Sequence, residues 1–256
     1  MPGTTQTRPV VLVTGGTGGV GRSVCATLAA GGYDVAFTYN SNAQKAADLS
    51  ATLKAAGAEV LAEAVKLSDP MAVSDYVVAV SERLGRIDAV VHASGPYPEQ
   101  RWVSSFSSDQ FRSHVDDELN AFFEVARCTL PHLRTSRGSL TAVTSVAVRR
   151  FPAKDGLSSI PKGGIEALVR AIALEEGRFG IRANSVAPGI LADGMMDMLL
   201  ATGDVPAAQT EFLNSHIPLR RLGTGAEVAA AVCFLVSDAA AYITGQVIDV
   251  DGGYSL

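Results

Sequence analysis

A glycine-rich segment spans residues 14–21 with the sequence Thr-Gly-Gly-Thr-Gly-Gly-Val-Gly. It follows a short apolar run and precedes a helical pattern, which is the context that a dinucleotide-binding turn requires. Glycines let the backbone turn tightly and approach a pyrophosphate, while the start of the helix offers free N–H groups and the positive end of its dipole. The segment therefore predicts a phosphate-binding turn with these contact residues: Gly15, Thr17, Gly19, Val20 and Gly21.

The residues after the next apolar run bear on the choice between the two nicotinamide dinucleotides. An NAD-selective protein usually places an acid about 20 residues beyond the glycine turn, against the ribose hydroxyls. Residues 38–42 contain no acid, so nothing there repels a 2′-phosphate. Asn40 and Ser41 are neutral donors, and Arg22 or Lys45 can add a positive charge. We therefore expect NADP; the alternative is that these polar residues only cap the next helix, a role for which Ser41 and Asn42 are both suited.

Short β-branched runs alternate with longer helical stretches, among them Val20–Ala30 and Ala43–Ala56. This alternation is typical of βαβ units whose parallel sheet is covered by helices on both faces. The expected strands are Val10–Val13, Val35–Tyr39, Val60–Val65, Ala89–His92, Ser139–Val143, Arg182–Val186 and Gln246–Val250. The pattern predicts an α/β Rossmann fold with a doubly wound, seven-stranded parallel sheet.

No linker or internal repeat interrupts the chain, so we expect a single nucleotide-binding domain over residues 1–256. From about residue 190 to 224 the pattern becomes irregular and rich in methionine and leucine. Long connections of this kind usually have a functional reason in a compact domain. We expect a lid over a small, partly apolar substrate, lined by Met195, Met196, Met198, Leu199, Leu200 and Phe212.

The composition excludes several functional classes. With 47% hydrophobic and 18% charged residues, the chain has ample apolar surface to bury. A formal net charge of −5, without a block of like charges, argues against binding to nucleic acid or to an anionic membrane. Cys25, Cys128 and Cys233 form no CxxC pair, so we expect neither a disulfide framework nor a metal site. Residues 1–9 lack the apolar run of a signal peptide and no run is long enough to span a membrane, so we expect a cytoplasmic protein.

Several spaced motifs resemble the short-chain dehydrogenase/reductase family, and most closely its β-ketoacyl-carrier-protein reductase branch. Besides the glycine turn, they are Leu130-Pro131-His132-Leu133, Ser145 at a strand end, Asn184-Ser185-Val186-Ala187-Pro188-Gly189, and Ile243-Thr244-Gly245-Gln246 through Asp251-Gly252-Gly253. The resemblance covers essentially the whole chain. In that family the Pro-Gly turn lies against the nicotinamide, which implies cofactor contacts at Pro188, Gly189 and Ile190.

The family's Asn-Asn-Ala-Gly after the fourth strand corresponds here to His92-Ala93-Ser94-Gly95. This departure keeps small residues and the glycine beside the cofactor, and we interpret His92 as a packed residue at the strand end. The other contacts that we expect with the cofactor are Tyr39, Asn40, Ser41, Leu67, Ser68, Ala93, Ser94, Gly95 and Lys162.

Carbonyl reduction needs a donor that polarises the carbonyl, a proton donor, and a cation that lowers the pKa of that donor. In the family a serine, a tyrosine and a lysine four residues later supply these, and Ser145 and Lys162 match the first and the last. Ser158 occupies the position of the tyrosine. A serine hydroxyl is a weaker acid than a phenol and its side chain is shorter, so the resemblance implies an atypical catalytic site. For Ser158 we favour a helix cap over proton donation, since Pro161 is tolerated only in a first turn.

The position of the family's relay asparagine holds Glu118. Glu118 either forms a buried pair with Lys162, which must offset a desolvation cost of several kcal/mol, or is an acid on the helix surface. Two other groups are candidate proton donors. Asp155 stands where the related enoyl-carrier-protein reductases have their tyrosine, and Tyr97 lies on a loop that could overhang the nicotinamide. We favour the simpler interpretations, a turn acid and a packed aromatic.

The sequence thus predicts an atypical NADP(H)-dependent oxidoreductase acting on a carbonyl or alcohol. Ser145, a water or the substrate itself would then supply the proton. Losing a general acid typically lowers the rate about 10²–10⁴-fold, and orientation of the reactants still accelerates the reaction. Two alternatives stay open. One is a non-redox dehydratase, isomerase or cyclase, and the other is a pseudoenzyme or scaffold that binds NADP(H). The resemblance also implies a homo-oligomer, either a tetramer or a dimer.

Overall fold

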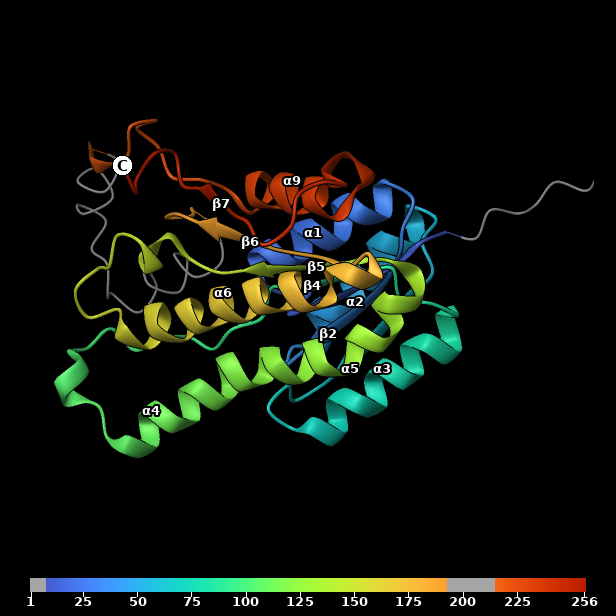
Figure 1. The fold of residues 1–256 in the computed structure, drawn as a ribbon, viewed down its shortest axis with the longest axis horizontal. Coiled ribbons are helices and arrows are strands. Elements are labelled where there is room, and N and C mark those ends of the chain that lie inside the picture. Colours follow the sequence, from blue (N-terminus) through green and yellow to red (C-terminus); the bar gives the residue numbers. More distant parts are fainter. Residues whose placement is uncertain (1–7, 193–214) are drawn as a thin grey trace, which may run out of the picture.

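The computed structural model describes residues 8–192 and 215–256. Its seven strands form one parallel sheet in the order β3-β2-β1-β4-β5-β6-β7, which confirms the predicted Rossmann fold (Figure 1). The strands are β1 (Val10–Thr14), β2 (Asp34–Tyr39), β3 (Val60–Ala64), β4 (Ala89–His92), β5 (Ser139–Val143), β6 (Arg182–Pro188) and β7 (Val247–Val250). Each lies within two residues of its predicted bounds.

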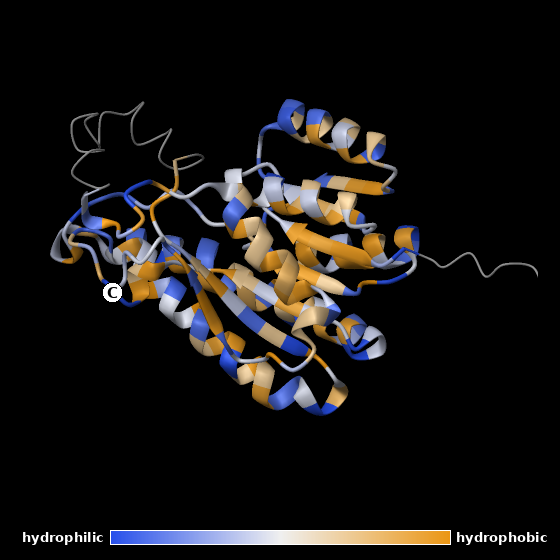
Figure 2. Ribbon diagram, turned by 90° about the horizontal axis from the view of Figure 1, so that it is seen from above, coloured by the Kyte–Doolittle hydropathy of each residue, from blue (hydrophilic) through white to orange (hydrophobic). Residues whose placement is uncertain are grey.

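Helices cover both faces of the sheet. One face carries α1 (Gly19–Ala30), α2 (Ala43–Ala55) and α9 (Gly225–Val236), and the other carries α3 (Pro70–Leu84), α5 (Ala121–Ser136) and α6 (Gly156–Glu176). Strand residues alternate between the two layers: Val11 packs on the α1 side and Leu12 on the α6 side. The central strands β1 and β4 are buried along their whole length and are mostly apolar, because helices cover both faces of the sheet. Figure 2 shows several strands coloured largely as hydrophobic.

A continuous helical run extends α5 toward the carboxyl edge of the sheet. It comprises α4 (Ser108–Val115), the π-helical turn η2 (Asp116–Asn120) and α5 itself (Figure 1). A capping box formed by Ser107 and Gln110 fixes the start of α4. Among the helices of the described ranges, none combines the length and the apolar character that crossing a bilayer requires.

The carboxyl ends of the central strands meet at one edge of the sheet. Thr14 of β1 is in register with His92 of β4, and His92 with Ala142 of β5. Ala142 is in turn in register with Ser185 of β6. Because the strands are parallel, the segments that follow them all emerge at this edge, where ligands of open α/β sheets bind.

Candidate active site

The glycine turn packs directly against the segment that follows β4. Gly15 has φ +68°, a conformation that favours glycine, and a Cβ on it would lie 2.8 Å from the carbonyl oxygen of Ala93. A Cβ on Gly21 would lie 2.2 Å from the carbonyl oxygen of Gly15. Both positions therefore require glycine, and the resulting turn brings β1 and the post-β4 segment to the same site.

The amino terminus of α1 fits the predicted pyrophosphate. Gly18 is the N-cap residue and brings no side chain to that end of the helix. The first N–H groups of a helix have no acceptor within it, so those of Gly19, Val20 and Gly21 face the turn with the positive end of the helix dipole. This is the arrangement that binds phosphate groups.

The predicted ribose and adenine contacts lie on the loops after β2 and β3. The side chain of Asn42 caps α2 by accepting a hydrogen bond from the Lys45 amide at 2.9 Å. The capping function therefore belongs to Asn42, while Asn40 and Ser41 are exposed at the strand end. The half-buried residues 67–68 follow β3, and Asp69 next to them caps α3.

The Pro-Gly turn after β6 is held against the end of β7. The Gly189 amide donates to the carbonyl of Val250 at 3.0 Å, and a Cβ on Gly189 would lie 2.7 Å from the Cα of Asp251. The carbonyl of Ile190 accepts from the Gly223 amide at 3.0 Å. The turn thus has a fixed position at the carboxyl edge, where the resemblance places the nicotinamide.

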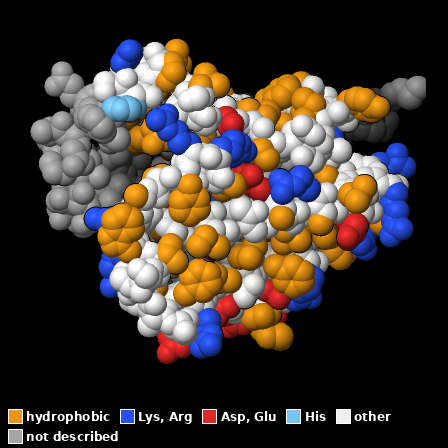
Figure 3. Space-filling model, turned by 60° about the vertical axis from the view of Figure 1, so that its left-hand side comes forward, with side chains coloured by type: hydrophobic (Ala, Val, Ile, Leu, Met, Phe, Trp, Pro, Cys, Tyr) orange, Lys and Arg blue, Asp and Glu red, His pale blue; other side chains and the backbone are white. Residues whose placement is uncertain are grey.

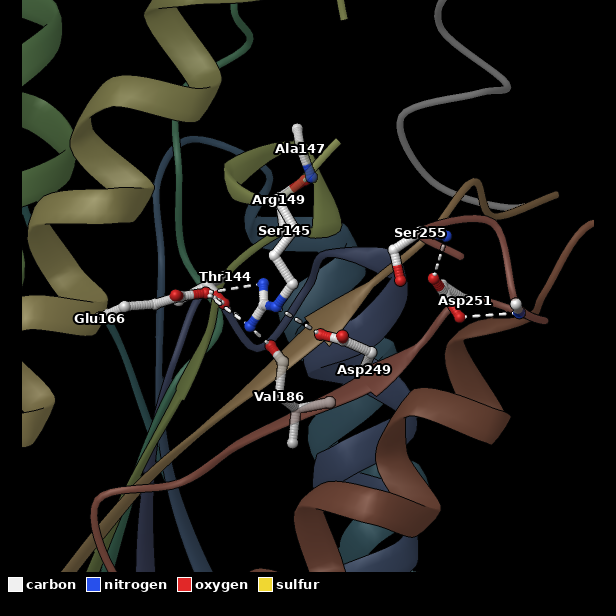
Figure 4. Close-up of polar contacts among 10 residues, drawn as sticks. Thr144, Ser145, Ala147, Arg149, Glu166, Val186, Asp249, Asp251 and Ser255 are labelled. Atoms are coloured by element: carbon white, nitrogen blue, oxygen red, sulfur yellow. Dashed lines mark hydrogen bonds and ion pairs between the residues drawn. The ribbon is translucent and has the colours of Figure 1, made fainter. Parts of the chain in front are cut away.

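Ser145 lies immediately beyond β5, in the turn that leads into the short 3₁₀ helix η3 (Val146–Val148). The amide of Thr144 donates to the carbonyl of Val186 at 2.8 Å, so the strand pairing continues up to Ser145. The Ser145 hydroxyl accepts a hydrogen bond from the Ala147 amide at 3.1 Å (Figure 4). Because Oγ only accepts in this contact, its own hydrogen can be donated to a substrate oxygen.

Lys162 forms a buried ion pair with Glu118. Its Nζ contacts Glu118 Oε1 and donates to the carbonyl of Val143 at 3.2 Å, and the two charged side chains are only 14% and 3% exposed. A Cβ on Gly95 would lie 2.7 Å from Glu118 Oε2, so the carboxylate fits beneath the Gly95 backbone only because that residue is glycine. Of the two interpretations left open by the sequence, the structure thus shows the buried pair.

Glu118 lies in the π-helical turn η2, and turns of this kind are often found at functional sites. The turn inserts an extra residue between α4 and α5 and sets the Glu118 side chain toward α6. A buried carboxylate costs several kcal/mol unless it is paired, so the Lys162 cation is what allows it to be there. The pair is therefore a specific feature of this chain.

Ser158 does not cap α6, which corrects the sequence analysis. The helix begins at Gly156, so Ser158 is its third residue and Pro161 lies in its second turn. The N-cap residue is Asp155, whose carboxylate accepts hydrogen bonds from Gln100 Nε2 and Ser159 Oγ, both at 2.8 Å. The helix starts earlier than expected because Asp155 and the Arg101 backbone pair in a β-bridge that fixes the entry to α6.

These contacts also bear on the two alternative proton donors. Asp155 is buried and accepts a hydrogen bond on each carboxylate oxygen, so it acts as a structural anchor between the post-β4 loop and α6. Tyr97 lines a hollow of about 400 Å³ beside α4, together with His114, Asp117 and Leu157. Tyr97 thus lines a space between α4 and the start of α6.

Two buried histidines flank this pair. His92 is 1% exposed, and its Nδ1 lies 2.9 Å from Thr14 Oγ1. Burial and then the Lys162 charge lower the pKa of His92 to about 3, so its ring is neutral near pH 7. His114 is 9% exposed, and burial lowers its pKa as well. Sequence reasoning missed His114, whose only signal was its position one helical turn before Glu118.

A second buried carboxylate lies one helical turn beyond Lys162. Glu166 is 5% exposed and accepts hydrogen bonds from Thr144 Oγ1 at 2.9 Å and from the Arg149 guanidinium at 3.3 Å. Arg149 also pairs with Asp249 of β7 at 3.2 Å (Figure 4). This network ties the Ser145 turn, α6 and β7 together. The sequence analysis missed it because its members are far apart in the chain.

Replacing Arg149 by methionine is expected to lower the free energy of unfolding by about 1.5–3 kcal/mol, because Glu166 loses charge-assisted hydrogen bonds while it remains buried. Urea denaturation of the purified protein measures this. The matched control is Arg150→Met, since Arg150 is exposed and contacts Tyr254 at the carboxyl terminus. Equal losses in the two variants would show that Arg149 is an ordinary surface residue.

The predicted lid lies largely outside the described residues. Met195, Met196, Met198, Leu199, Leu200 and Phe212 all fall within residues 193–214. Its described flanks meet, because Leu191 pairs with Gly223 in a β-bridge. Within residues 8–192 and 215–256, no group of three or more His, Cys, Asp or Glu side chains is placed to hold a metal ion.

Comparisons with known proteins cover nearly the whole chain. The family model described as enoyl-(acyl carrier protein) reductase matches residues 15–255. Levodione reductase of Leifsonia aquatica is 35% identical, over 99% of this chain and 97% of its own length. The 3-oxoacyl-(acyl-carrier-protein) reductase FabG of Pseudomonas aeruginosa is 33% identical, over 95% of this chain and 96% of its own length. The crystal structure of levodione reductase superposes with a TM-score of 0.91, covering 96% of this chain and 97% of the other, at 32% identity.

Proposed function

Since the chain belongs to the short-chain dehydrogenase/reductase family, we propose that it is an NADP(H)-dependent oxidoreductase that interconverts a carbonyl and an alcohol on a small, partly apolar molecule. Its relatives are short-chain oxidoreductases of carbonyl and alcohol substrates. The observation that carries the proposal is the placement of Ser145 and Lys162 at the same edge of the sheet as the glycine turn.

The bound dinucleotide supplies a hydride at its nicotinamide ring. The α1 amides would hold its pyrophosphate, and the residues after β2 its ribose. The fixed Pro188–Gly189 turn would hold the nicotinamide end. Holding the reacting atoms in a near-attack geometry contributes a large part of such a rate acceleration.

The site works without a tyrosine at position 158. The Ser145 hydroxyl, with Oγ already accepting from the Ala147 amide, is oriented to donate to the substrate oxygen. Lys162 adds a positive charge that stabilises negative charge on that oxygen, although Glu118 neutralises part of it. We therefore propose an enzyme in which orientation and electrostatics contribute more than general acid catalysis does.

We expect NADP(H) to bind about tenfold or more tightly than NAD(H), because Asn40 and Ser41 are exposed and uncharged where an NAD-selective site has an acid. Calorimetric titration with each cofactor measures the ratio. Asn40→Asp should abolish the preference by repelling the 2′-phosphate, whereas Asn42→Asp, which retains the α2 cap, is the control. Equal affinities of the wild-type protein for both cofactors would contradict the assignment.

A panel of ketones with NADPH tests the proposed activity directly, and oxidation of NADPH that depends on the ketone supports it. The second candidate function is binding of NADP(H) without redox chemistry. It is favoured by the contacts of the Lys162 amine with Glu118 and with the Val143 carbonyl, because these contacts occupy the cation that would assist the reaction. Tight NADPH binding without oxidation on any ketone would favour that candidate. Conversion of a substrate without cofactor turnover would indicate a dehydratase, isomerase or cyclase.

We also propose that the protein is a homo-oligomer. Its described surface exposes large hydrophobic side chains, and Figure 3 shows many of this type spread over one face. The most exposed of them in the described ranges are Tyr242, Leu256, Leu174, Met71 and Leu219. Extensive apolar exposure often marks a protein–protein interface. Light scattering at several concentrations distinguishes a tetramer or dimer from a monomer.

A further inference from the structure

The turn that carries Ser145 is held on both sides by one buried carboxylate of α6. Thr144, the residue before Ser145, donates its hydroxyl hydrogen to Glu166 Oε1 at 2.9 Å. Arg149, at the end of η3, donates to the same oxygen from Nη1 at 3.3 Å and from Nη2 at 3.4 Å. Bonds to a buried charged group are shielded from water and are stronger for it. Glu166 therefore closes the Ser145 turn into a loop.

Glu166 also links this loop to the lysine of the candidate site. It lies four residues after Lys162 in α6, so the two side chains are on the same face of the helix. Lys162 Nζ donates to the carbonyl of Val143 at 3.2 Å, and Glu166 accepts from Thr144, the next residue. Two successive turns of α6 thus hold the two residues directly before Ser145. These contacts set the separation between the serine hydroxyl and the lysine amine.

Arg149 reaches in addition the strand that fixes the Pro-Gly turn. Its Nε lies 3.2 Å from Asp249 Oδ1 of β7, and Figure 4 shows the guanidinium between the two carboxylates. Val250, the residue after Asp249, accepts a hydrogen bond from the Gly189 amide at 3.0 Å. Because β7 lies at the edge of the sheet, the ion pair attaches it to the Ser145 turn as well as to β6. One arginine thus connects three parts of the candidate site.

An arginine suits this place better than a lysine would. Its planar guanidinium has several N–H donors in fixed directions, so one side chain bonds Glu166 and Asp249 together. The ammonium of a lysine is a point charge on a flexible chain and would leave one carboxylate without its partner. Arg149 therefore fixes a geometry as well as a charge.

We propose that Arg149 and Glu166 are positioning residues for hydride transfer. Together they hold the Ser145 hydroxyl, the Lys162 amine and the turn at residues 188–189 in one arrangement. The inference rests on the proposed function, and the two residues act through these parts without contacting the substrate. Because the site lacks a tyrosine at position 158, its rate depends on orientation, and a misplacement of about 1 Å costs about 10²-fold.

The test is the rate of ketone-dependent NADPH oxidation by Arg149→Ala, divided by the number of NADPH-binding sites that calorimetry counts in the same sample. We expect the rate per site to fall about 10-fold to 100-fold, because the three parts lose their common connection. NADPH affinity should change little, because the pyrophosphate and ribose contacts lie on other loops. A sample that is merely less folded would lose sites and rate in proportion, so its rate per site would not fall.

Guanidinium ion should restore part of the rate of Arg149→Ala. The Arg149 side chain is partly exposed, so its removal opens a space between the two carboxylates that a small cation can enter. Low millimolar guanidinium is sufficient and lies far below the molar range that unfolds proteins. Ammonium at the same concentration, and the Arg149→Lys variant without additive, should restore much less. The matched control is Arg150→Ala, whose exposed arginine contacts Tyr254 and whose rate per site should equal that of the wild-type protein.

An active wild-type protein whose Arg149→Ala variant has the same rate per site as Arg150→Ala, or a loss that guanidinium does not reverse, would overturn the positioning role. Absence of NADPH oxidation in every protein, wild type included, would instead contradict the proposed function. Amide hydrogen exchange in the cofactor-free protein then decides on the positioning itself. The hydrogen-bonded amides of Thr144 and Gly189 should exchange about tenfold faster in Arg149→Ala than in the control. Equal exchange would show that Arg149 does not hold the two turns.

Discussion

Replacing Lys162 by methionine is expected to lower the free energy of unfolding by about 3–5 kcal/mol, because the change leaves the Glu118 carboxylate buried without a cation. Both side chains are largely hidden from water, so solvent cannot compensate for the lost partner. Urea denaturation of the cofactor-free protein measures the loss. Lys154→Met is the matched control, since the exposed Lys154 lies over the Trp102 ring and should cost well under half as much.

The double variant Lys162→Met with Glu118→Gln separates stability from cofactor binding. It removes both buried charges, so most of the lost stability should return. Cofactor affinity should stay weak in the double variant, because in the family the lysine contacts the ribose hydroxyls. Wild-type stability in the Lys162→Met single variant would show that the ion pair contributes little to the free energy of unfolding. Wild-type cofactor affinity in the double variant would show that Lys162 does not contact the dinucleotide.

The variant that combines Ser158→Tyr with Glu118→Asn is expected to oxidise NADPH on a β-ketoester about 10²-fold faster than the wild-type protein. A positioned general acid contributes about 10²–10⁴-fold, and the combination restores both a phenol and a neutral group behind the lysine. Position 158 is one helical turn before Lys162, so a phenol there shares its face of α6.

Neither single change should achieve this rate. In Ser158→Tyr the phenol meets a lysine already paired with Glu118, and in Glu118→Asn the lysine is released while no phenol is present to donate the proton. The gain of the pair should therefore exceed the sum of the single changes in free energy, as for residues that act as a unit. Rates for all four proteins under one set of conditions test this. A wild-type protein as fast as the double variant would show that proton supply is already efficient and that the missing tyrosine at position 158 does not limit the rate.

Local pattern was sufficient to predict the architecture. The strands were identified from apolar runs that are buried on both faces, and the glycine turn from its position between a strand and a helix. Asn42 was one of two candidate caps for α2, and the structure shows that it is the cap. The predicted start of α6 was wrong, because Pro161 suggested that it lay in the first turn of the helix. In the structure that proline lies inside the helix, in its second turn.

The sequence by itself determined the parallel sheet and the glycine turn, because these depend on residues close together in the chain and on the rule that parallel strands end together. Ser145 and Lys162 were implied by the resemblance to the family. The tertiary structure alone decided that Glu118 is buried against Lys162, that His114 lines a hollow beside α4, and that Arg149 joins Glu166 to Asp249. Each of these contacts joins segments that are distant in sequence. Whether a charged side chain is solvated or paired depends on the neighbours that packing gives it, and no local pattern contains that information.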